Sequence, residues 1–300
     1  MTGCCNRLAW LLCAAMAMAP AAGGELRGSW QGYWLARSAA QAGPLAQAHA
    51  LLPAIEAAPA SSGVTLAQLQ GSAAWGGLQW HADVVAQAER PEGGPGPTQA
   101  TVMEGYAAAA LGGWQWSLGR KVVGWDVGYG FRPNDVVQQE VRRPLVAVPL
   151  QGRQVLVAER YTQDAAWSLV AVNPTAEGSA TGAREPALAA RWYQRLGALD
   201  AYAFVRWGRR TGGSLGAAFA WVASDAVELH GSLRHMARFD TWEDASAAPG
   251  ALALASPWRA ATGGAAQQAL LGGTWTNAQQ VSVLLEAWYD GTAPSAGQWR

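Results

Sequence analysis

The feature that most constrains this chain is an alternation of apolar and polar residues with a period of two. Between Leu78 and Glu89 every even-numbered position is apolar, whereas five of the six odd-numbered positions are polar. Such alternation is typical of a β-strand with one face against apolar material and the other against water. The pattern returns near 114–118, 123–132, 201–208, 215–221, 227–234 and 280–289. We therefore predict an all-β, antiparallel chain of about a dozen or more strands.

Alternation alone does not separate a soluble sandwich from a membrane barrel, because both have one apolar and one polar face. Charged residues make up only 14% of the chain, against about 25% in ordinary soluble proteins. Strands of about ten residues suit an oblique crossing of a bilayer. Aromatic side chains near the predicted strand ends fit an interfacial girdle: Trp75, Trp114, Trp207 and Tyr289. A transmembrane β-barrel is favoured, with a secreted soluble β-protein as the alternative.

The first residues predict export. Arg7 precedes the apolar run 8–19, and small residues follow Pro20. This is the pattern of a secretory signal peptide, which we place at residues 1–22, before a barrel domain at 23–300. A buried N-terminal helix is the alternative. The chain is accordingly expected in the outer membrane of a Gram-negative bacterium, with outer-membrane lipid as its surroundings.

Cysteine usage and charge exclude several classes of protein. Cys4, Cys5 and Cys13 all lie within the predicted signal peptide, so the mature chain is expected to contain no cysteine. Disulfide-stabilised domains, cysteine-based zinc sites and cysteine nucleophiles are thereby excluded. The 21 basic and 21 acidic residues balance, and this excludes a strongly basic nucleic-acid binder.

One segment fits the strand pattern poorly, and the end of the chain raises a separate question. Residues 38–60 are rich in alanine, with apolar residues at helical spacing from Leu45 to Ile55; a loop is favoured over a short periplasmic helix or a plug. The chain stops at Arg300 shortly after a loop at 290–295. We expect that it lacks closing strands and is a truncated product.

Several short motifs carry a resemblance to a known group of proteins. They are Glu104-Gly105-Tyr106, Leu118-Gly119-Arg120-Lys121, the run 124–137 beginning Gly124-Trp125-Asp126, Glu159-Arg160-Tyr161, Trp167-Ser168-Leu169 and Asn173-Pro174. Together they resemble the bacterial outer-membrane barrels related to alginate-export-like porins. The resemblance implies an outer-membrane barrel that acts as a passive channel for small solutes or a saccharide, and it implies no cofactor.

Polar residues on the predicted wet face are the candidates for the functional site. The pore-lining candidates are His81, Asp83, Asp126, Arg132, Asp135, Glu228, His230, Arg234 and Glu286. Pairs such as His81 and Asp83 could in principle chelate a metal or exchange protons, but barrel interiors commonly carry mixed charges. No catalytic, cofactor-binding or metal-binding residue is predicted.

Asp126, Arg132 and Asp135 form the most specific polar set. They would lie at a constriction or, in the favoured interpretation, would fix the turn at Pro133 and bond Asp126 to a neighbouring strand. The loop at 133–153, with Glu140, Arg142 and Arg143, is expected to fold inward.

The sequence thus predicts a non-enzymatic barrel that passes small solutes or a saccharide. A structural, non-conducting barrel and a barrel lipase or protease are the alternatives. The substrate and the oligomeric state are left open.

Overall fold

The computed structural model describes residues 24–36, 61–92, 94–139, 150–177, 180–244 and 258–294. The predicted signal peptide with its three cysteines, the segment 38–60, the charged residues of the loop at 140–149 and the last six residues lie outside the described residues. The chain divides into two compact units, 1–107 and 108–300. The described residues form 15 strands and one short 3-10 helix, and none of their helices is long and apolar enough to cross a membrane.

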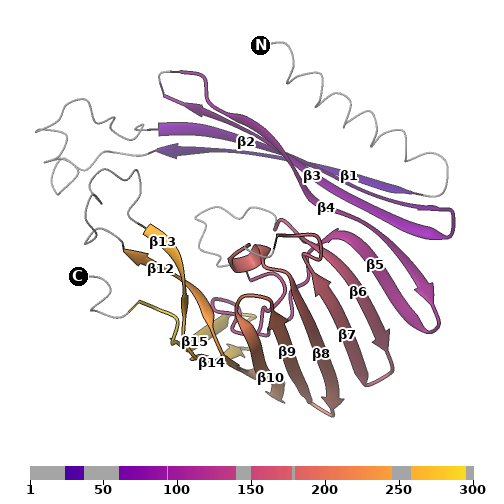
Figure 1. Ribbon diagram of the computed structural model, residues 1–300, viewed down its shortest axis with the longest axis vertical. Helices are drawn as coiled ribbons and strands as arrows, with labels where there is room; N and C mark the ends of the chain where they lie inside the picture. The colour runs from indigo at the N-terminus through magenta and orange to yellow at the C-terminus, as the bar shows by residue number, and fades with distance from the viewer. Residues whose placement is uncertain are drawn as a thin grey trace, which may run out of the picture. The chain divides into compact units, whose positions relative to one another are not determined.

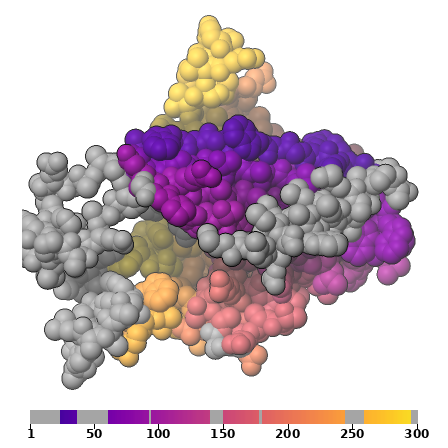
Figure 2. Space-filling model, turned by 90° about the horizontal axis from the view of Figure 1, so that it is seen from above, coloured from indigo at the N-terminus to yellow at the C-terminus, as the bar shows by residue number. Residues whose placement is uncertain are grey.

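The first unit is built from antiparallel hairpins. Its strands are β1 (Glu25–Ala36), β2 (Ser61–Trp75), β3 (Leu78–Pro91) and most of β4 (Thr98–Leu111). β1 pairs with β2, and β2 pairs with β3; in the space-filling view the indigo atoms of β1 lie along the purple atoms of the strands that follow (Figure 2). Gly76 and Gly77 both have positive φ, the conformation that a tight two-residue hairpin requires at both positions.

The second unit is one antiparallel sheet with a separate hairpin (Figure 1). The strands are β5 (Trp114–Lys121), β6 (Arg153–Tyr161), β7 (Ala165–Val172), β8 (Ala187–Leu196), β9 (Leu199–Gly208), β10 (Gly212–Ser224), β11 (Val227–Met236), β14 (Ala266–Thr276) and β15 (Ser282–Asp290). They follow one another in this order across the sheet. The 3-10 helix η1 (Gly182–Arg184) precedes β8, and the separate hairpin is formed by β12 (Phe239–Asp244) and β13 (Trp258–Gly263).

The connections of this sheet differ in length at its two ends. Because the strands are antiparallel, successive connections alternate between the ends. Short turns at 162–164, 197–198, 225–226 and 277–281 lie at one end, the turn end. The connections 122–152, 173–186 and 237–265 lie at the other, the loop end, together with the short turn 209–211. This division is typical of outer-membrane barrels, which have short periplasmic turns and longer external loops.

Both units bury polar residues and expose large apolar ones. On β11, His230 is fully buried and Ser232 is 5% exposed, whereas Leu233 is 55% exposed. On β3 Asp83 is buried together with Val85, while Trp75 at the preceding strand end is 74% exposed. Water-soluble sheets bury their apolar face, so the arrangement is inverted. On β11 the alternation predicted from the sequence therefore has its polar face on the buried side, whereas β6 and β7 bury valines and expose leucines.

The predicted strand over 123–132 is wrong. After β5 the chain leaves the sheet, and residues 122–139, here called the inner segment, lie against the buried face of the second unit's strands, here called the inner wall. Val123, Trp125, Val136 and Val137 of this segment pack in one apolar cluster with inner-wall residues of β6–β10. The wall side chains of this cluster are Val155, Val157, Val170, Val172, Ala187, Ala189, Phe204 and Ala218. The alternation over 123–127 arises because Val123, Trp125 and Val127 face the wall, whereas Tyr129 is exposed.

Candidate functional site

Asp126 shapes the inner segment and joins it to β11. Its Oδ2 accepts hydrogen bonds from Ser232 Oγ at 3.1 Å and from the backbone N–H of Asn134. Its Oδ1 accepts one from the backbone N–H of Val127 at 2.8 Å. Burial raises the pKa of Asp126, although these hydrogen bonds and the nearby Arg132 act in the opposite direction. The carboxylate therefore closes a loop over 126–134 and attaches it to the wall.

Asn134 is the second attachment point, and it is completely buried. Its side-chain amide donates to Ser232 Oγ at 2.8 Å and lies 3.1 Å from the backbone oxygens of Ala217 and Leu233. It thus bridges β10 and β11. A β-carbon at Gly216 would overlap Asn134 Oδ1, so only glycine at this position leaves room for the amide.

Glu286 holds the middle of the inner segment from β15. Its Oε1 accepts the backbone N–H of Tyr129 at 2.8 Å, and its Oε2 accepts that of Gly130 at 2.7 Å. His230 Nε2 lies 3.0 Å from Glu286 Oε1, and the Tyr129 ring approaches the His230 ring edge-on at 5.5 Å. A β-carbon at Gly130 would lie only 3.0 Å from Glu286 Oε2. Absence of a side chain there permits the close approach.

Arginines fix the end of the segment. Arg234 Nη1 donates to the backbone oxygen of Pro133 at 3.2 Å, and its Nη2 donates to Ser214 Oγ at 3.1 Å. Arg132 Nη2 donates to the backbone oxygen of Asp126 at 3.3 Å. The backbone N–H of Asp135 donates to the backbone oxygen of Arg132 at 3.2 Å, which closes the turn around Pro133. These contacts agree with the interpretation in which Asp126, Arg132 and Asp135 fix a turn and bond to a strand.

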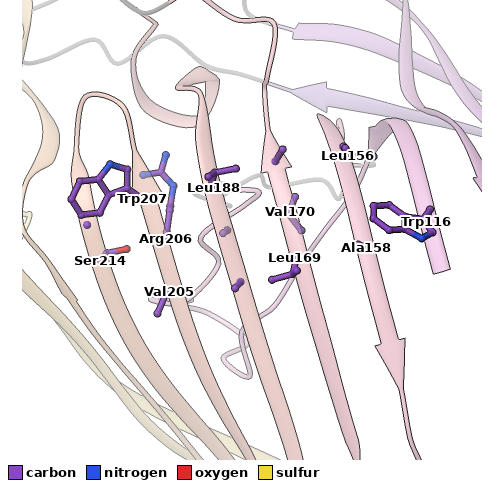
Figure 3. A pocket seen from close by; sticks show the side chains of 14 residues that line it. Trp116, Leu156, Ala158, Leu169, Val170, Leu188, Val205, Arg206, Trp207 and Ser214 are labelled. Carbon is purple, nitrogen blue, oxygen red and sulfur yellow. The ribbon is translucent and has the colours of Figure 1, made fainter. Parts of the chain in front are cut away.

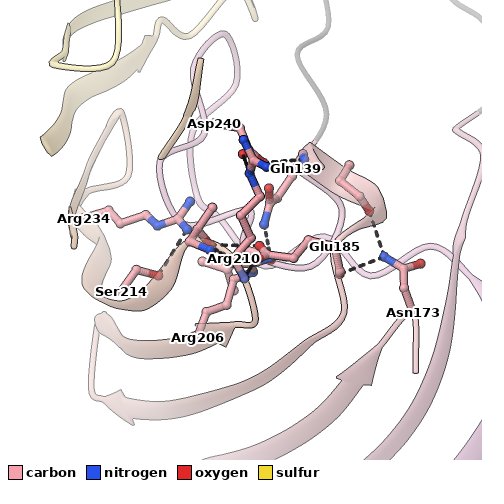
Figure 4. Close-up of polar contacts among 12 residues, drawn as sticks. Gln139, Asn173, Glu185, Arg206, Arg210, Ser214, Arg234 and Asp240 are labelled. Carbon is pink, nitrogen blue, oxygen red and sulfur yellow. Dashed lines mark hydrogen bonds and ion pairs between the residues drawn. The ribbon is translucent and has the colours of Figure 1, made fainter. Parts of the chain in front are cut away.

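A second polar cluster, at the loop end, was missed by the sequence analysis (Figure 4). Glu185 is buried and accepts hydrogen bonds from Arg206 Nη2 at 2.8 Å, from the backbone N–H of Thr211 at 2.7 Å and from the backbone N–H of Arg210. Burial alone would raise the pKa of Glu185, but the bonds from Arg206 and Thr211 outweigh it and lower the pKa. Arg210 Nε in turn donates to Asp240 Oδ1 at 2.7 Å. The cluster therefore connects η1, β9 and β12.

His81 and Asp83 lie in the first unit. Asp83 accepts hydrogen bonds from the side-chain amides of Gln68 and Gln70 at 2.8 and 2.9 Å. His81 Nε2 is 3.5 Å from Glu104 Oε2, and its ring lies 5.0 Å from that of Tyr106. The described residues contain no group of three histidine, cysteine, aspartate or glutamate side chains that could hold a metal ion.

Of the nine predicted site residues, six meet where the inner segment contacts the wall: Asp126, Arg132, Asp135, His230, Arg234 and Glu286. Glu228 lies on the same face of β11, half-buried near the turn end. Asn134 and Ser232 are the anchors that sequence reasoning missed. Their pairing joins residues 98 positions apart, and a single sequence carries no local signal for it.

Among known proteins, the chain is similar in fold to several solved structures. No family model matches the chain, and no curated protein matches it. The chain is similar to a mutant of the Rh. blastica porin with 11% identity and a TM-score of 0.42, covering 90% of this chain and 95% of that one. It is similar to a loop-deletion mutant of OmpT, an outer-membrane protein of Vibrio cholerae, with 11% identity and a TM-score of 0.38, covering 89% and 93%.

Proposed function

We propose that this chain is an outer-membrane β-barrel channel whose lumen is narrowed by the inner segment and through which small polar solutes diffuse passively. The observation that carries the proposal is the inverted burial of the strands. Leu188 and Trp207 are 65% and 69% exposed on one face of the sheet, while Ser168, Arg206 and His230 are buried on the other. In hydrocarbon the apolar face needs no further cover, whereas in water it would form a large exposed patch.

The inner segment supplies the narrow point. It is tethered to the strands by two carboxylates and an amide, those of Asp126, Glu286 and Asn134. Both acids and arginines lie where the inner segment contacts the strands, so a few neighbouring side chains set the charge that a solute meets. Rings of charged side chains are a general means by which pores select solutes.

An aromatic row on the inner wall favours a saccharide among the candidate solutes. Tyr193 and Tyr202 have ring centroids 5.1 Å apart. The ring of Phe204 lies parallel to that of Tyr202 at 6.1 Å and supports it from within the buried apolar cluster. The two tyrosines are half-buried on β8 and β9. Flat apolar faces with a polar edge suit the mixed surface of a sugar ring. We therefore propose a saccharide as the finer substrate class.

Two measurements test the channel. Protein extracted from membranes should migrate faster on a denaturing gel before boiling than after it, because an unboiled barrel stays compact. The refolded chain in a planar bilayer should then give stepwise conductance that falls when a linear saccharide is added. A heat-modifiable but electrically silent protein would favour the structural barrel. A folded, monomeric protein that stays dissolved without detergent would overturn the proposal.

A further inference from the structure

An apolar groove of about 670 Å³ hollows the face of β5–β9 that points away from the inner segment. Figure 3 shows Trp116 and Trp207 at its two sides, with β6, β7 and β8 between them. Ala158, Ala171 and Ala190 line it. In register, Ala158 and Ala190 lie on either side of Leu169, so short side chains alternate with a longer one. The alanines make the depression, because their neighbours on the same face are leucines and tryptophans.

The groove extends to the loop end of the sheet, where positively charged side chains follow the apolar lining. Trp207 and Gly213 line it, and the turn between them contains Arg209 and Arg210. Arg209 and Arg238 are exposed. Arg238 Nη2 lies 3.4 Å from the position that a β-carbon on Gly212 would take, so its guanidinium is beside this turn. Positive charge therefore stands directly beyond the apolar lining.

The acids nearest to this turn are already engaged. Glu185 is buried and paired with Arg206 at 2.8 Å, and Asp240 is paired with Arg210 at 2.7 Å. Arg209 and Arg238 thus give the turn a local excess of positive charge that suits an anionic group.

We propose that this groove and the two arginines bind a phosphate-bearing lipid with several acyl chains, its phosphate at Arg209 and Arg238 and its chains over the alanines. The inference rests on the proposed function, because only a membrane barrel presents this face to lipid. The volume is within the range of small-molecule sites, about 300–1,000 Å³. Four strand spacings separate β5 from β9, or about 19 Å, which favours a lipid with chains side by side over a single chain.

The position of the two arginines at the loop end of the strands supports the same ligand. Long loops mark the external end of outer-membrane barrels, so the arginines stand at the level of the outer leaflet's headgroups. Guanidinium groups bind phosphate through paired, charge-assisted hydrogen bonds. Indole side chains favour the boundary between headgroups and hydrocarbon, and Trp207 lies two residues before Arg209.

The test counts lipids bound to the full chain. Protein in mild detergent receives equal amounts of diphosphoryl lipid A and phosphatidylcholine, and native mass spectrometry measures the adducts. We expect a lipid A adduct on the wild type. The double variant Arg209→Gln/Arg238→Gln should bind it about thirtyfold less, in line with the contribution of two arginines near anionic lipid. Ala171→Trp, which fills the groove, should reduce the same adduct, and Ala171→Leu replaces it where the tryptophan variant fails to fold.

Two matched control variants test whether the loss of lipid A binding is specific to this groove and to these arginines. Arg195→Gln removes an exposed arginine at the turn end of β8, and Ala287→Trp enlarges an exposed alanine on β15; both should bind lipid A as the wild type does. Equal binding by the wild type, the arginine pair variant and the groove variant would overturn the inference. Complete displacement of lipid A by inorganic phosphate would also overturn it, because the groove would then contribute nothing. A heat-modifiable barrel without lipid preference refutes this inference alone, whereas a protein soluble without detergent refutes the proposed function.

Discussion

Glu286 accepts the backbone N–H of Tyr129 at 2.8 Å across 157 positions of sequence. The same carboxylate accepts the next N–H, that of Gly130, through its other oxygen. One side chain on β15 thus satisfies two consecutive backbone donors of a segment that has no strand partner. Tyr129 and Gly130 are themselves exposed, so the effect of Glu286 is to fix the position of the inner segment rather than to satisfy buried donors.

Replacing Glu286 should therefore loosen the inner segment. Glu286→Ala removes the acceptor of both exposed N–H groups, at a net cost of about 0.5–1.5 kcal/mol each because water can take its place, while Glu286→Gln retains one acceptor oxygen. We expect larger and noisier single-channel conductance for the alanine variant and an intermediate value for the glutamine variant. Glu228→Gln, on the same face of β11, is the control. Wild-type conductance in both Glu286 variants would contradict the role of the segment as the narrow point.

Gly216 and Asn134 should be energetically coupled. A methyl group at Gly216 would overlap the Asn134 amide, so Gly216→Ala should lower the thermal midpoint of the folded barrel. Asn134→Ala should lower it too, because the amide bridges β10 and β11. The double variant should be less destabilised than the sum of the two, since the overlap is gone once the amide is removed. Strict additivity in this cycle would show that the amide does not occupy that place.

Leu271 tests which face meets hydrocarbon. It is 63% exposed at the middle of β14. In a bilayer Leu271→Arg should cost about 2–4 kcal/mol, whereas at an exposed site in water the change would stay within about 0.5 kcal/mol. Gln267→Arg, at the strand's loop end, is the control and should cost about 0–1 kcal/mol. Denaturant titration of the refolded protein in lipid vesicles provides the measurement, and equal costs for the two variants would count against a membrane setting.

Glu185 should make the barrel sensitive to acid. Its folded pKa is lowered below the ordinary value of 4.5, so its contribution to stability is fully present above that pH. The contribution is lost as the pH falls through the folded pKa, because the carboxylate that Arg206 binds becomes protonated. The thermal midpoints of wild type and Glu185→Gln should differ at neutral pH and converge well below pH 4.5. Asp225→Asn, an exposed turn acid, should show no such convergence, and a constant gap for Glu185→Gln would refute the expectation.

Much of the sheet could be predicted because alternation is a local property. The alternation over 227–234 predicts that Leu229 and Leu233 lie on one face and His230 on the other. The structure exposes the two leucines and buries the histidine. Trp75, Trp114, Trp207 and Tyr289 also lie at or next to strand ends, as expected.

The inner segment could not be predicted in the same way. Val123, Trp125 and Val127 alternate as a strand would, but their apolar partners lie on the inner wall and not in lipid. A period of two indicates only that one side of the segment is apolar. It does not indicate whether lipid or another part of the protein covers that side. The anchors depend on pairings such as Asp126 with Ser232, 106 positions apart, which no short window contains.

The long sequence separation of these anchors bears on how the protein is assembled. Asp126, Asn134 and Tyr129 precede all their partners on β10, β11 and β15. In chain order, the apolar cluster of the inner segment with β6–β9 can therefore form before its polar anchors on β11 and β15 are available. When the strands pair in chain order, the contact with Glu286 forms after the other anchors, and the inner segment takes its described position only once β15 has joined the sheet.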